Sequence, residues 1–493
     1  MKKLKNRTIS SGVALNSIML TFVQVITTLF GIIVTKLLSV NFSLQEYGTY
    51  SQALLLTTTV TSVSILGLTN ATNYFYNRTK DKGLQHRYIA TIFNIQYIVG
   101  IACSFIIFFS RYELAAYLKN DDLIDIIPIV ALTPFFTNLI SMFQTLFVSI
   151  GKARIIAIRN LIVSLIKMIS VVISCYVLNS IITVLVVILI LDFIQVVYFY
   201  VLFKGYEYPI RIREGSLVLV KEILNFSIPM SVYVLTNTLS RDIDKYVISI
   251  FANTETLAIY TNAAKVLPFD MLTASMITVL VPVITRMINQ SRYKEAQAVF
   301  RLYLKIGCII TCIFVGGAIF LSRDLMVLLY DEKYLEGLPV FVLYLVVDMI
   351  RFANVTTILS GAGKTKILMT ISIITLICNS ILNVLGYKMM GMIGPAFVTL
   401  LLTIFMTLAL LHFGAKEIHT KMEKLFDFRE IGKIVVEIML VGVVVYFISV
   451  YLNSLRKCNL MIFLTCYGIY LIIMGVMNYK KIISYVKSLN KFK

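Results

Sequence analysis

Residues 181–203 read IITVLVVILILDFIQVVYFYVLF, an apolar run with a single charged residue, Asp192. A bilayer core about 30 Å thick is crossed by roughly 20 apolar residues in an α-helix. Similar runs recur along the whole chain, with only short polar stretches between them. Of the 493 residues, 59% are hydrophobic and 14% are charged, whereas soluble proteins carry about a quarter charged residues. The sequence therefore predicts an all-α, polytopic membrane protein.

The apolar runs predict about fourteen transmembrane helices. We place them at 13–38, 45–69, 87–110, 123–149, 155–178, 181–203, 223–251, 256–285, 301–321, 338–362, 367–388, 391–414, 432–452 and 459–478. Cytoplasmic connections of membrane proteins are enriched in Lys and Arg. Most of the 45 Lys and Arg fall on the side of the N-terminus, so both termini are expected in the cytoplasm. The net charge of +20 is thus a signal of topology and does not indicate nucleic-acid binding.

A shift of about 212 residues aligns the first six helices with the next six. Gly151-Lys-Ala-Arg-Ile155 matches Gly363-Lys-Thr-Lys-Ile367, and Ser110-Arg111 matches Ser322-Arg323. An even number of helices per copy makes the two copies parallel, as in alternating-access transporters. We expect two parallel six-helix repeats around a central cavity. The predicted domains are an N-terminal lobe at 1–204, a C-terminal lobe at 221–414, and a last part at 415–493 with a cytoplasmic connection, helices 13 and 14 and a basic tail.

Several predicted helices carry charges, each of which costs about 2.5–3.5 kcal/mol at mid-bilayer on insertion scales. These are Lys167, Asp192, Arg241, Asp242, Asp244, Lys245, Lys265, Asp270, Asp348 and Arg351. Helical spacing lets Asp348 pair with Arg351 and Arg241 with Asp244, and a purely structural role is an open alternative for both pairs. Lys305 lies near a helix end, where its long side chain can reach the interface.

Lys265 has no carboxylate at the i±3 or i±4 positions. A buried ammonium without a partner is costly, whereas a diphosphate headgroup needs cationic partners. Lys265 is therefore the first candidate for a cation in the cavity.

No set of residues with catalytic spacing appears in the sequence, so we expect a protein that is not an enzyme. Gly361-Ala-Gly-Lys-Thr365 resembles a phosphate-binding loop, but the position that needs its first glycine is Ile358, and no strand is expected before it. Cys308 and Cys312 share a helix face without a nearby His or carboxylate, so no metal site is expected. No cofactor is expected either.

A series of short motifs occurs in the order and spacing of a known family. They are Glu46–Tyr50, Gly67–Asn70, Ile228–Pro229, Arg241–Ile248, Ala258–Pro268, Asn379–Asn383 and Gly391–Ala396. By these motifs the chain, to about residue 480, resembles the polysaccharide-exporter branch of the multidrug/oligosaccharidyl-lipid/polysaccharide superfamily, the Wzx-type O-antigen flippases.

The resemblance implies a two-lobed flippase of the bacterial inner membrane with a central cationic cavity. The implied substrate is an undecaprenyl-diphosphate-linked oligosaccharide, used for O-antigen, capsule or exopolysaccharide assembly. Membrane lipids, and the polymerase and chain-length proteins of the same pathway, are the implied partners. Lys265 takes the place of a cavity-facing basic residue of the related peptidoglycan-precursor flippases. The other substrate-binding candidates are Arg241, Lys245, Lys167 and Arg351. Coupling to H⁺ or Na⁺ would use Asp244, Asp242, Asp270, Asp348 or Asp192.

Three alternatives are open. A peptidoglycan lipid-precursor flippase would carry more basic residues in helices 1 and 2, where this chain has only Lys36. A multidrug or cation antiporter would be expected to end after helix 12. A membrane polymerase would be expected to expose a large outer loop, and the predicted outer loops are short.

Overall fold

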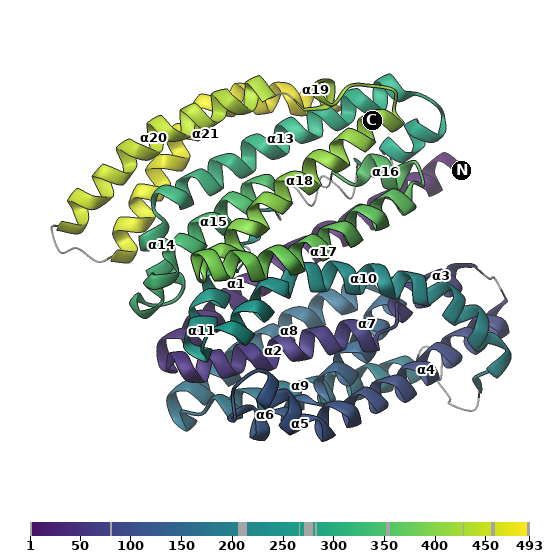
Figure 1. The fold of residues 1–493 in the computed structure, drawn as a ribbon. Coiled ribbons are helices and arrows are strands. Elements are labelled where there is room, and N and C mark those ends of the chain that lie inside the picture. The colour runs from purple at the N-terminus through teal and green to yellow at the C-terminus, as the bar shows by residue number, and fades with distance from the viewer. Residues whose placement is uncertain are drawn as a thin grey trace. The chain divides into compact units, whose positions relative to one another are not determined.

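The computed structural model describes residues 2–78, 81–205, 214–265, 267–270, 280–281, 283–351, 355–426, 428–454 and 459–490. The described residues form helices and turns and contain no strand (Figure 1). By its internal contacts the chain divides into two compact units, Met1–Ala258 and Ile259–Lys493. The predicted all-α architecture is confirmed.

The first unit consists mainly of long helices joined by short turns. Its elements are α1 (Lys2–Asn41), α2 (Leu44–Ser64), α3 (Leu68–Arg78), α4 (Lys82–Phe109), α5 (Arg111–Tyr117), α6 (Leu123–Val130), α7 (Thr133–Ser149), α8 (Ala153–Ile173), the π-helical turn η1 (Ser174–Leu178), α9 (Ile181–Lys204) and α10 (Leu217–Phe251). The helix α11 (Thr254–Ala263) contains the division between the units.

The second unit is built in the same way. Its elements are the 3₁₀ turn η3 (Pro268–Asp270), α13 (Tyr293–Phe320), α14 (Ser322–Leu329), the 3₁₀ turn η4 (Glu332–Gly337), α15 (Leu338–Ile350), α16 (Thr357–Gly361), α17 (Thr365–Met390), α18 (Ile393–Glu417), α19 (Met422–Leu425), α20 (Phe428–Ser454) and α21 (Asn459–Asn490).

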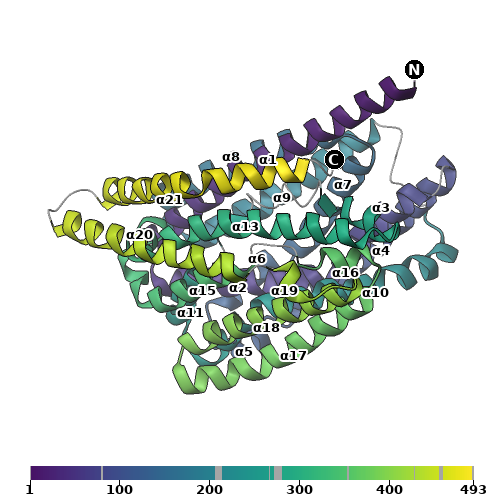
Figure 2. The same cartoon turned by 90° about the horizontal axis from the view of Figure 1, so that it is seen from above.

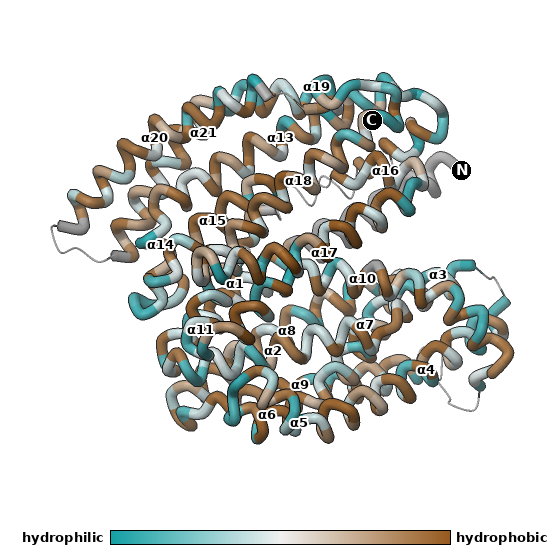
Figure 3. The backbone as a smooth tube through the Cα atoms, viewed as in Figure 1, coloured by the Kyte–Doolittle hydropathy of each residue, from teal (hydrophilic) through white to brown (hydrophobic). Residues whose placement is uncertain are grey.

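Twelve segments of the described chain are long and apolar enough to cross a membrane. They correspond to twelve of the predicted spans, and hydrophobic residues run along their length while hydrophilic residues gather near helix ends, for example around α19 (Figure 3). The other two predicted spans, 256–285 and 338–362, include residues outside the described part. The number fourteen therefore stays a prediction, while the membrane-spanning class is confirmed.

The predicted helix at 256–285 is wrong as a continuous element. α11 ends at Ala263, and the short 3₁₀ turn η3 follows at Pro268–Asp270. Proline lacks an N–H, and its ring clashes with the carbonyl four residues earlier in a helix, here that of Ala264. The helix therefore ends before the proline, and Lys265 lies in the connection.

The predicted helix at 45–69 is also interrupted. α2 ends at Ser64 and α3 begins at Leu68, because Leu66 and Gly67 adopt positive φ values of 46° and 67°. A Cβ on Gly67 would lie 2.4 Å from the Ser227 carbonyl oxygen of α10. Glycine is required here twice, for its backbone conformation and for the close approach of α10.

The internal repeat has a counterpart in backbone conformation. Gly151 (φ +83°) separates α7 from α8, and Gly363 (φ +71°) separates α16 from α17. Likewise, Arg111 begins α5 and Ser322 begins α14, each directly after a long helix. These matched breaks support the repeat predicted from the sequence.

In the first unit, α10 packs along α2, α3 and α4. Gly48 of α2 permits a close contact, since a Cβ there would lie 2.2 Å from the Thr254 carbonyl oxygen. Polar bonds also join α2 to α10, as Gln52 Nε2 donates to Ser249 Oγ over 3.0 Å. The contacts of α10 place it in the first unit. In the sequence repeat, however, α10 is the first helix of the second copy. The lobe boundaries 1–204 and 221–414 stay a prediction.

In the second unit, α20 and α21 lie alongside α13 (Figures 1 and 2). Glycines allow this approach. A Cβ on Gly317 would lie 2.6 Å from the Tyr470 ring, and a Cβ on Gly442 would lie 2.1 Å from the Phe320 ring. We call these three helices the α13–α20–α21 bundle. The two C-terminal helices are therefore tightly packed parts of their unit.

Candidate functional site

Four charged residues predicted for the site lie on the last turns of α10. Arg241 is exposed, while Asp242 and Asp244 are buried, with 8% and 1% of their surface exposed. Lys245 Nζ lies 2.5 Å from Asp242 Oδ1 in an ion pair, and the Lys245 backbone N–H donates to Asp244 Oδ1 over 2.8 Å. Of these two cations, Arg241 is the one with an exposed charge, because Lys245 is already neutralised by a carboxylate.

Lys265 is exposed and follows the end of α11. Two residues later, the Leu267 N–H, which leaves the helical pattern, donates to Asp348 Oδ2 of α15 over 3.1 Å. Both Leu267 and Asp348 are buried, where an unsatisfied backbone donor would cost about 1–3 kcal/mol. Asp348 therefore fixes the chain next to Lys265. The backbone of Asp270 belongs to η3, but its side chain lies outside the described residues.

Arg351 caps the C-terminus of α15 and is exposed. Its Nη2 lies 3.5 Å from the Thr403 hydroxyl of α18, which is a long contact. The pairing of Asp348 with Arg351 that helical spacing allows stays a prediction. The contact that the structure does show for Asp348 is the hydrogen bond from the Leu267 backbone.

Lys167 and Asp192 come together between α8 and α9. Their side chains are half-buried and interact electrostatically. Gln195 Nε2 donates to Asp192 Oδ1 over 3.0 Å, and Gln195 Oε1 accepts a hydrogen bond from Arg159. We call Arg159, Lys167, Asp192 and Gln195 the α8–α9 cluster. Lys167 of α8 therefore lies beside a carboxylate of α9. The sequence of α8 alone does not predict this neighbour.

Arg159 is a buried functional-site candidate that sequence reasoning missed. Its guanidinium carbon lies 4.8 Å from the centroid of the Phe199 ring, and Nη1 donates to Asn160 over 2.6 Å. The sequence groups Arg159 with the basic cytoplasmic residues at the start of α8. Its position two turns into that helix, facing Gln195 of α9, is a contact between distant segments and leaves no local signal.

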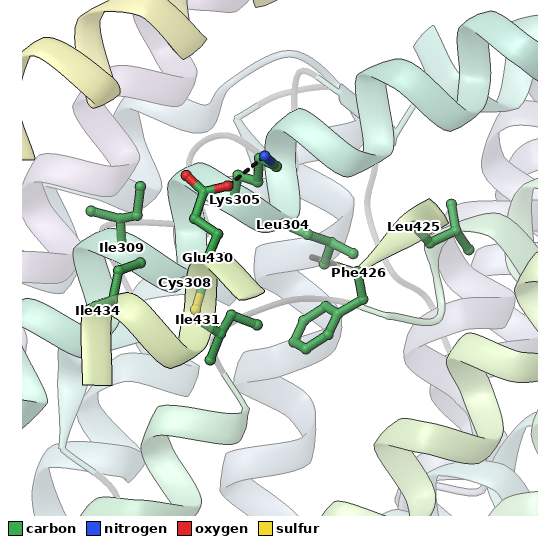
Figure 4. Close-up of a pocket in the computed structure, with 9 residues that line it drawn as sticks. All are labelled: Leu304, Lys305, Cys308, Ile309, Leu425, Phe426, Glu430, Ile431 and Ile434. Carbon is green, nitrogen blue, oxygen red and sulfur yellow. Dashed lines mark ion pairs between the residues drawn. The ribbon is translucent and has the colours of Figure 1, made fainter. Parts of the chain in front are cut away.

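A small pocket lies between α13 and α20 in the second unit. Apolar side chains form most of its wall, and Lys305 and Glu430 point toward each other and form an ion pair there (Figure 4). Tyr485 of α21 donates its hydroxyl to Glu430 as well. Lys305 is thus paired with a carboxylate at the start of α20, a partner that lies far away in sequence. Its extension to the interface stays a prediction.

Within each unit, the site residues therefore form separate groups. The first unit holds the α10 group and the α8–α9 cluster, and the second holds Lys265 with Asp348, and Arg351. No group of three or more His, Cys, Asp or Glu suited to a metal ion occurs in the part of the chain that was described. The arrangement places cations and hydrogen-bonding groups on membrane helices.

Comparison with known proteins identifies the family. Residues 33–339 match the family described as polysaccharide biosynthesis protein, and the chain belongs to that family. No curated protein matches the sequence. Family membership thus rests on a match that spans most of the chain.

Solved structures share the fold at low sequence identity. A lipid II flippase MurJ in an inward closed conformation matches with a TM-score of 0.75 and 16% identity, over 94% of this chain and all of that one. An inward-facing multidrug resistance MATE family transporter of the MOP superfamily matches with a TM-score of 0.66 and 14% identity, over 80% and 94%. A MOP superfamily transporter from Pyrococcus furiosus matches with 0.57 and 14%, over 83% and 95%. The fold is that of MOP-superfamily transporters.

Proposed function

We propose that this protein is a flippase that moves a polyprenyl-diphosphate-linked oligosaccharide across the bacterial inner membrane by alternating access. The oligosaccharide would be a repeat unit for O-antigen, capsule or exopolysaccharide. The observation that carries the proposal is the combination of membership in a polysaccharide biosynthesis family with a transporter fold. The protein would break no covalent bond, both termini would lie in the cytoplasm, and polymerase and chain-length proteins would act next in the pathway.

The extent of the fold match supports a lipid-linked substrate. The similarity to the lipid II flippase covers 94% of this chain, whereas that to the MATE and Pyrococcus transporters covers 80% and 83%. A peptidoglycan-precursor flippase is therefore the second candidate. The family described as polysaccharide biosynthesis protein favours the oligosaccharide over the peptidoglycan precursor.

Lys265 is the residue that we propose as the main ligand of the diphosphate. It is exposed, and the hydrogen bond between Leu267 and Asp348 fixes the turn on which it lies. Arg241 is the second choice, since its guanidinium is exposed and suits bidentate binding of phosphate oxygens. Lys245, Lys167 and Arg351 are weaker candidates. The first two have a carboxylate nearby, and Arg351 already contacts Thr403.

The test is complementation of a strain that lacks this gene. Wild type should restore surface polysaccharide, and without it the lipid-linked repeat unit should accumulate on the cytoplasmic leaflet. Lys265→Ala should fail to restore export at normal protein level, and Lys265→Arg should restore much of it. Lys388→Ala is the matched control, because Lys388 is exposed at the end of α17.

Three outcomes would overturn parts of this proposal. Normal polysaccharide with lost drug resistance in the deletion strain would indicate an antiporter. Loss of viability with accumulated peptidoglycan precursor would indicate the second candidate. Full export by Lys265→Ala would remove the role of Lys265 and leave the flippase itself in place.

We also propose that α20 and α21 guide the polyprenyl tail along exposed apolar side chains such as Val436. Truncation before α20 cannot test this, because it would uncover Gly317 of α13 and unfold the bundle. Val436→Asn, which places a polar group on this face, should instead slow export, while Ile162→Asn, on the exposed face of α8, should have no effect. Equal export by both variants would exclude this face of α20 as a path for the tail.

Coupling to H⁺ or Na⁺ is proposed through one of the buried carboxylates. Asp348 joins α15 to the turn beside Lys265, and Asp242 is in an ion pair, so their loss should disturb the structure. Asp244 and Asp192 accept hydrogen bonds from the Lys245 N–H and from Gln195, which lie on their own helices. We take these two carboxylates as the first choices. Transport into vesicles should lose its dependence on the ion gradient in Asp244→Asn or Asp192→Asn, and unchanged gradient dependence in both would exclude them.

A further inference from the structure

A second, larger pocket lies in the second unit where α13 and α20 end. Residues of α14, η4 and α20 form its wall, and its volume is about 1030 Å³ with the open mouth included. Its polar members are Arg323, Asp324, Glu332, Tyr446 and Ser449. We call it the α14–α20 pocket. Under the orientation proposed above, it opens on the outer side of the membrane.

One hydrogen bond joins the polar groups of two helices in this pocket. The Ser449 hydroxyl of α20 donates to Asp324 Oδ2 of α14 over 2.8 Å, so that the carboxylate is fixed on the wall. Arg323 and Glu332 are exposed, and the Tyr446 ring is half-exposed. Among the described residues, none forms an ion pair or hydrogen bond with the Arg323 guanidinium.

The internal repeat shows how Arg323 differs from its counterpart in the first unit. Its counterpart Arg111 in the first unit lies between two aromatic rings, 4.9 Å from the centroid of Phe108 and 4.8 Å from that of Tyr112. Arg111 Nη2 also donates to the Tyr112 hydroxyl over 3.2 Å. At a shift of 212, Phe108 corresponds to Phe320, which also lines the pocket.

The difference between the copies is the residue after the arginine. Tyr112 of the first copy corresponds to Asp324 of the second. The tyrosine ring covers its neighbouring arginine, whereas the aspartate turns toward Ser449 of α20 and leaves the arginine facing the pocket. In the second copy, Arg323 and Asp324 therefore line a pocket. In the first copy, Tyr112 contacts the corresponding arginine, Arg111.

We propose that the α14–α20 pocket binds an uncharged part of an oligosaccharide. Sugar rings present hydroxyls that donate and accept hydrogen bonds, and an apolar face that packs on an aromatic ring. Asp324 and Glu332 accept hydrogen bonds, Arg323 donates them, and Tyr446 offers the ring. One cation with two carboxylates gives a net negative wall, which disfavours a phosphate or diphosphate headgroup.

This proposal rests on the proposed function, since it makes the pocket a site for the glycan on the outer side after translocation. The volume accessible to water-sized molecules is about 450 Å³, which lies within the range of small-molecule sites, roughly 300–1,000 Å³. A glycan site apart from the cations that hold the diphosphate would retain the repeat unit until the next protein of the pathway takes it.

The test measures binding of the free oligosaccharide, released from the polysaccharide of the host and lacking lipid and phosphate. The full-length protein in lipid nanodiscs is titrated calorimetrically. Arg323→Gln should weaken binding about tenfold, the loss of one charge-assisted hydrogen bond. Arg111→Gln is the matched control and should bind as wild type does. Asp324→Tyr, which restores the pattern of the first copy, should abolish binding.

Since Arg323 is exposed, its replacement should not affect folding, and equal melting temperatures would verify this. Wild-type affinity in Arg323→Gln, equal weakening in both arginine variants, or no binding to wild type would each overturn the proposal. Binding of glycerol phosphate that depends on Arg323, without binding of the oligosaccharide, would show a lipid headgroup site and overturn it too. The binding assay does not depend on export, so the pocket can fail while the complementation test still supports the flippase.

Discussion

Two groups of helices in this protein hold charged residues in opposite ways. In the α8–α9 cluster, Arg159, Gln195 and Asp192 form a hydrogen-bonded row between helices that contain no glycine. In the α13–α20–α21 bundle, Gly317 and Gly442 bring the backbones close together, and the Lys305–Glu430 pair lies near the start of α20. Close backbone contacts at glycines join the helices of the bundle, with polar pairs such as Lys481–Glu437 beside them, whereas hydrogen bonds between long side chains link α8 and α9.

The largest effect that tests this comparison is expected from Gly442→Val. A Cβ at this position would overlap the Phe320 ring, and such overpacking should lower the free energy of unfolding by about 3 kcal/mol. Thermal unfolding of the purified protein in detergent measures it. Gly432→Val on the same helix is the control, because nothing lies within 4 Å of a Cβ there. Similar melting temperatures for the two variants would mean that the bundle does not depend on close packing.

Arg159→Ala should have the next largest effect. It removes a hydrogen bond from a charged donor to Gln195 in a buried site, which should cost about 2 kcal/mol. Arg154→Ala, an exposed residue one turn earlier on α8, should leave the melting temperature unchanged. Arg159→Met keeps the apolar part of the side chain and removes its hydrogen bonds. If this variant were as stable as wild type, the hydrogen-bonded row would not contribute to the stability of the fold.

A smaller effect is expected from Glu430→Gln. The glutamine keeps an acceptor for the Tyr485 hydroxyl but loses the charge that pairs with Lys305. Because the pair is only partly shielded from solvent, we expect about 1 kcal/mol. The double variant Lys305→Glu with Glu430→Lys exchanges the two residues. Its free energy of unfolding should recover much of what Glu430→Gln loses. No recovery would indicate that the site does not depend on the ion pair.

The smallest effect is expected from Lys481→Met. Lys481 Nζ lies 3.2 Å from Glu437 Oε1 of α20, but more than a third of its side chain is exposed. Water competes for such a charge, so the change in unfolding free energy should stay below about 1 kcal/mol. If Lys481→Met lowered the free energy of unfolding more than Glu430→Gln does, the more exposed pair would be the stronger one. That result would contradict the importance of burial.

Sequence alone predicts well those helices whose limits are set locally. The span predicted at 181–203 is α9 at Ile181–Lys204, because an uninterrupted apolar run ends on both sides at polar residues. The predicted helix at 459–478 continues to Asn490 in α21, because contacts of Tyr485 with α20 extend the helix beyond its apolar part. Local composition does not contain that information.

The site is less predictable, because its contacts join distant segments. Lys265 was selected from its own helical neighbours, yet the helix ends before it and Asp348, 83 positions later in the sequence, fixes the turn. Arg159 lies in the basic first part of α8, and its buried contact is with Gln195 of α9, 36 positions later in the sequence. In both cases a buried polar group finds its partner through tertiary packing, which a single sequence does not specify.

The glycine contacts of α13 also bear on how the chain is made. About a hundred residues separate Phe320 from Phe428, so α13 leaves the ribosome well before the two helices that cover it. At synthesis rates of about 5–20 residues per second, this interval is on the order of 10 s. During that time the groove at Gly316 and Gly317 can be covered only by lipid or by the insertion machinery. Because α20 and α21 follow α13 in synthesis, they complete a surface that was made earlier in translation, and their loss should leave a membrane-inserted but unfinished protein for quality-control proteases.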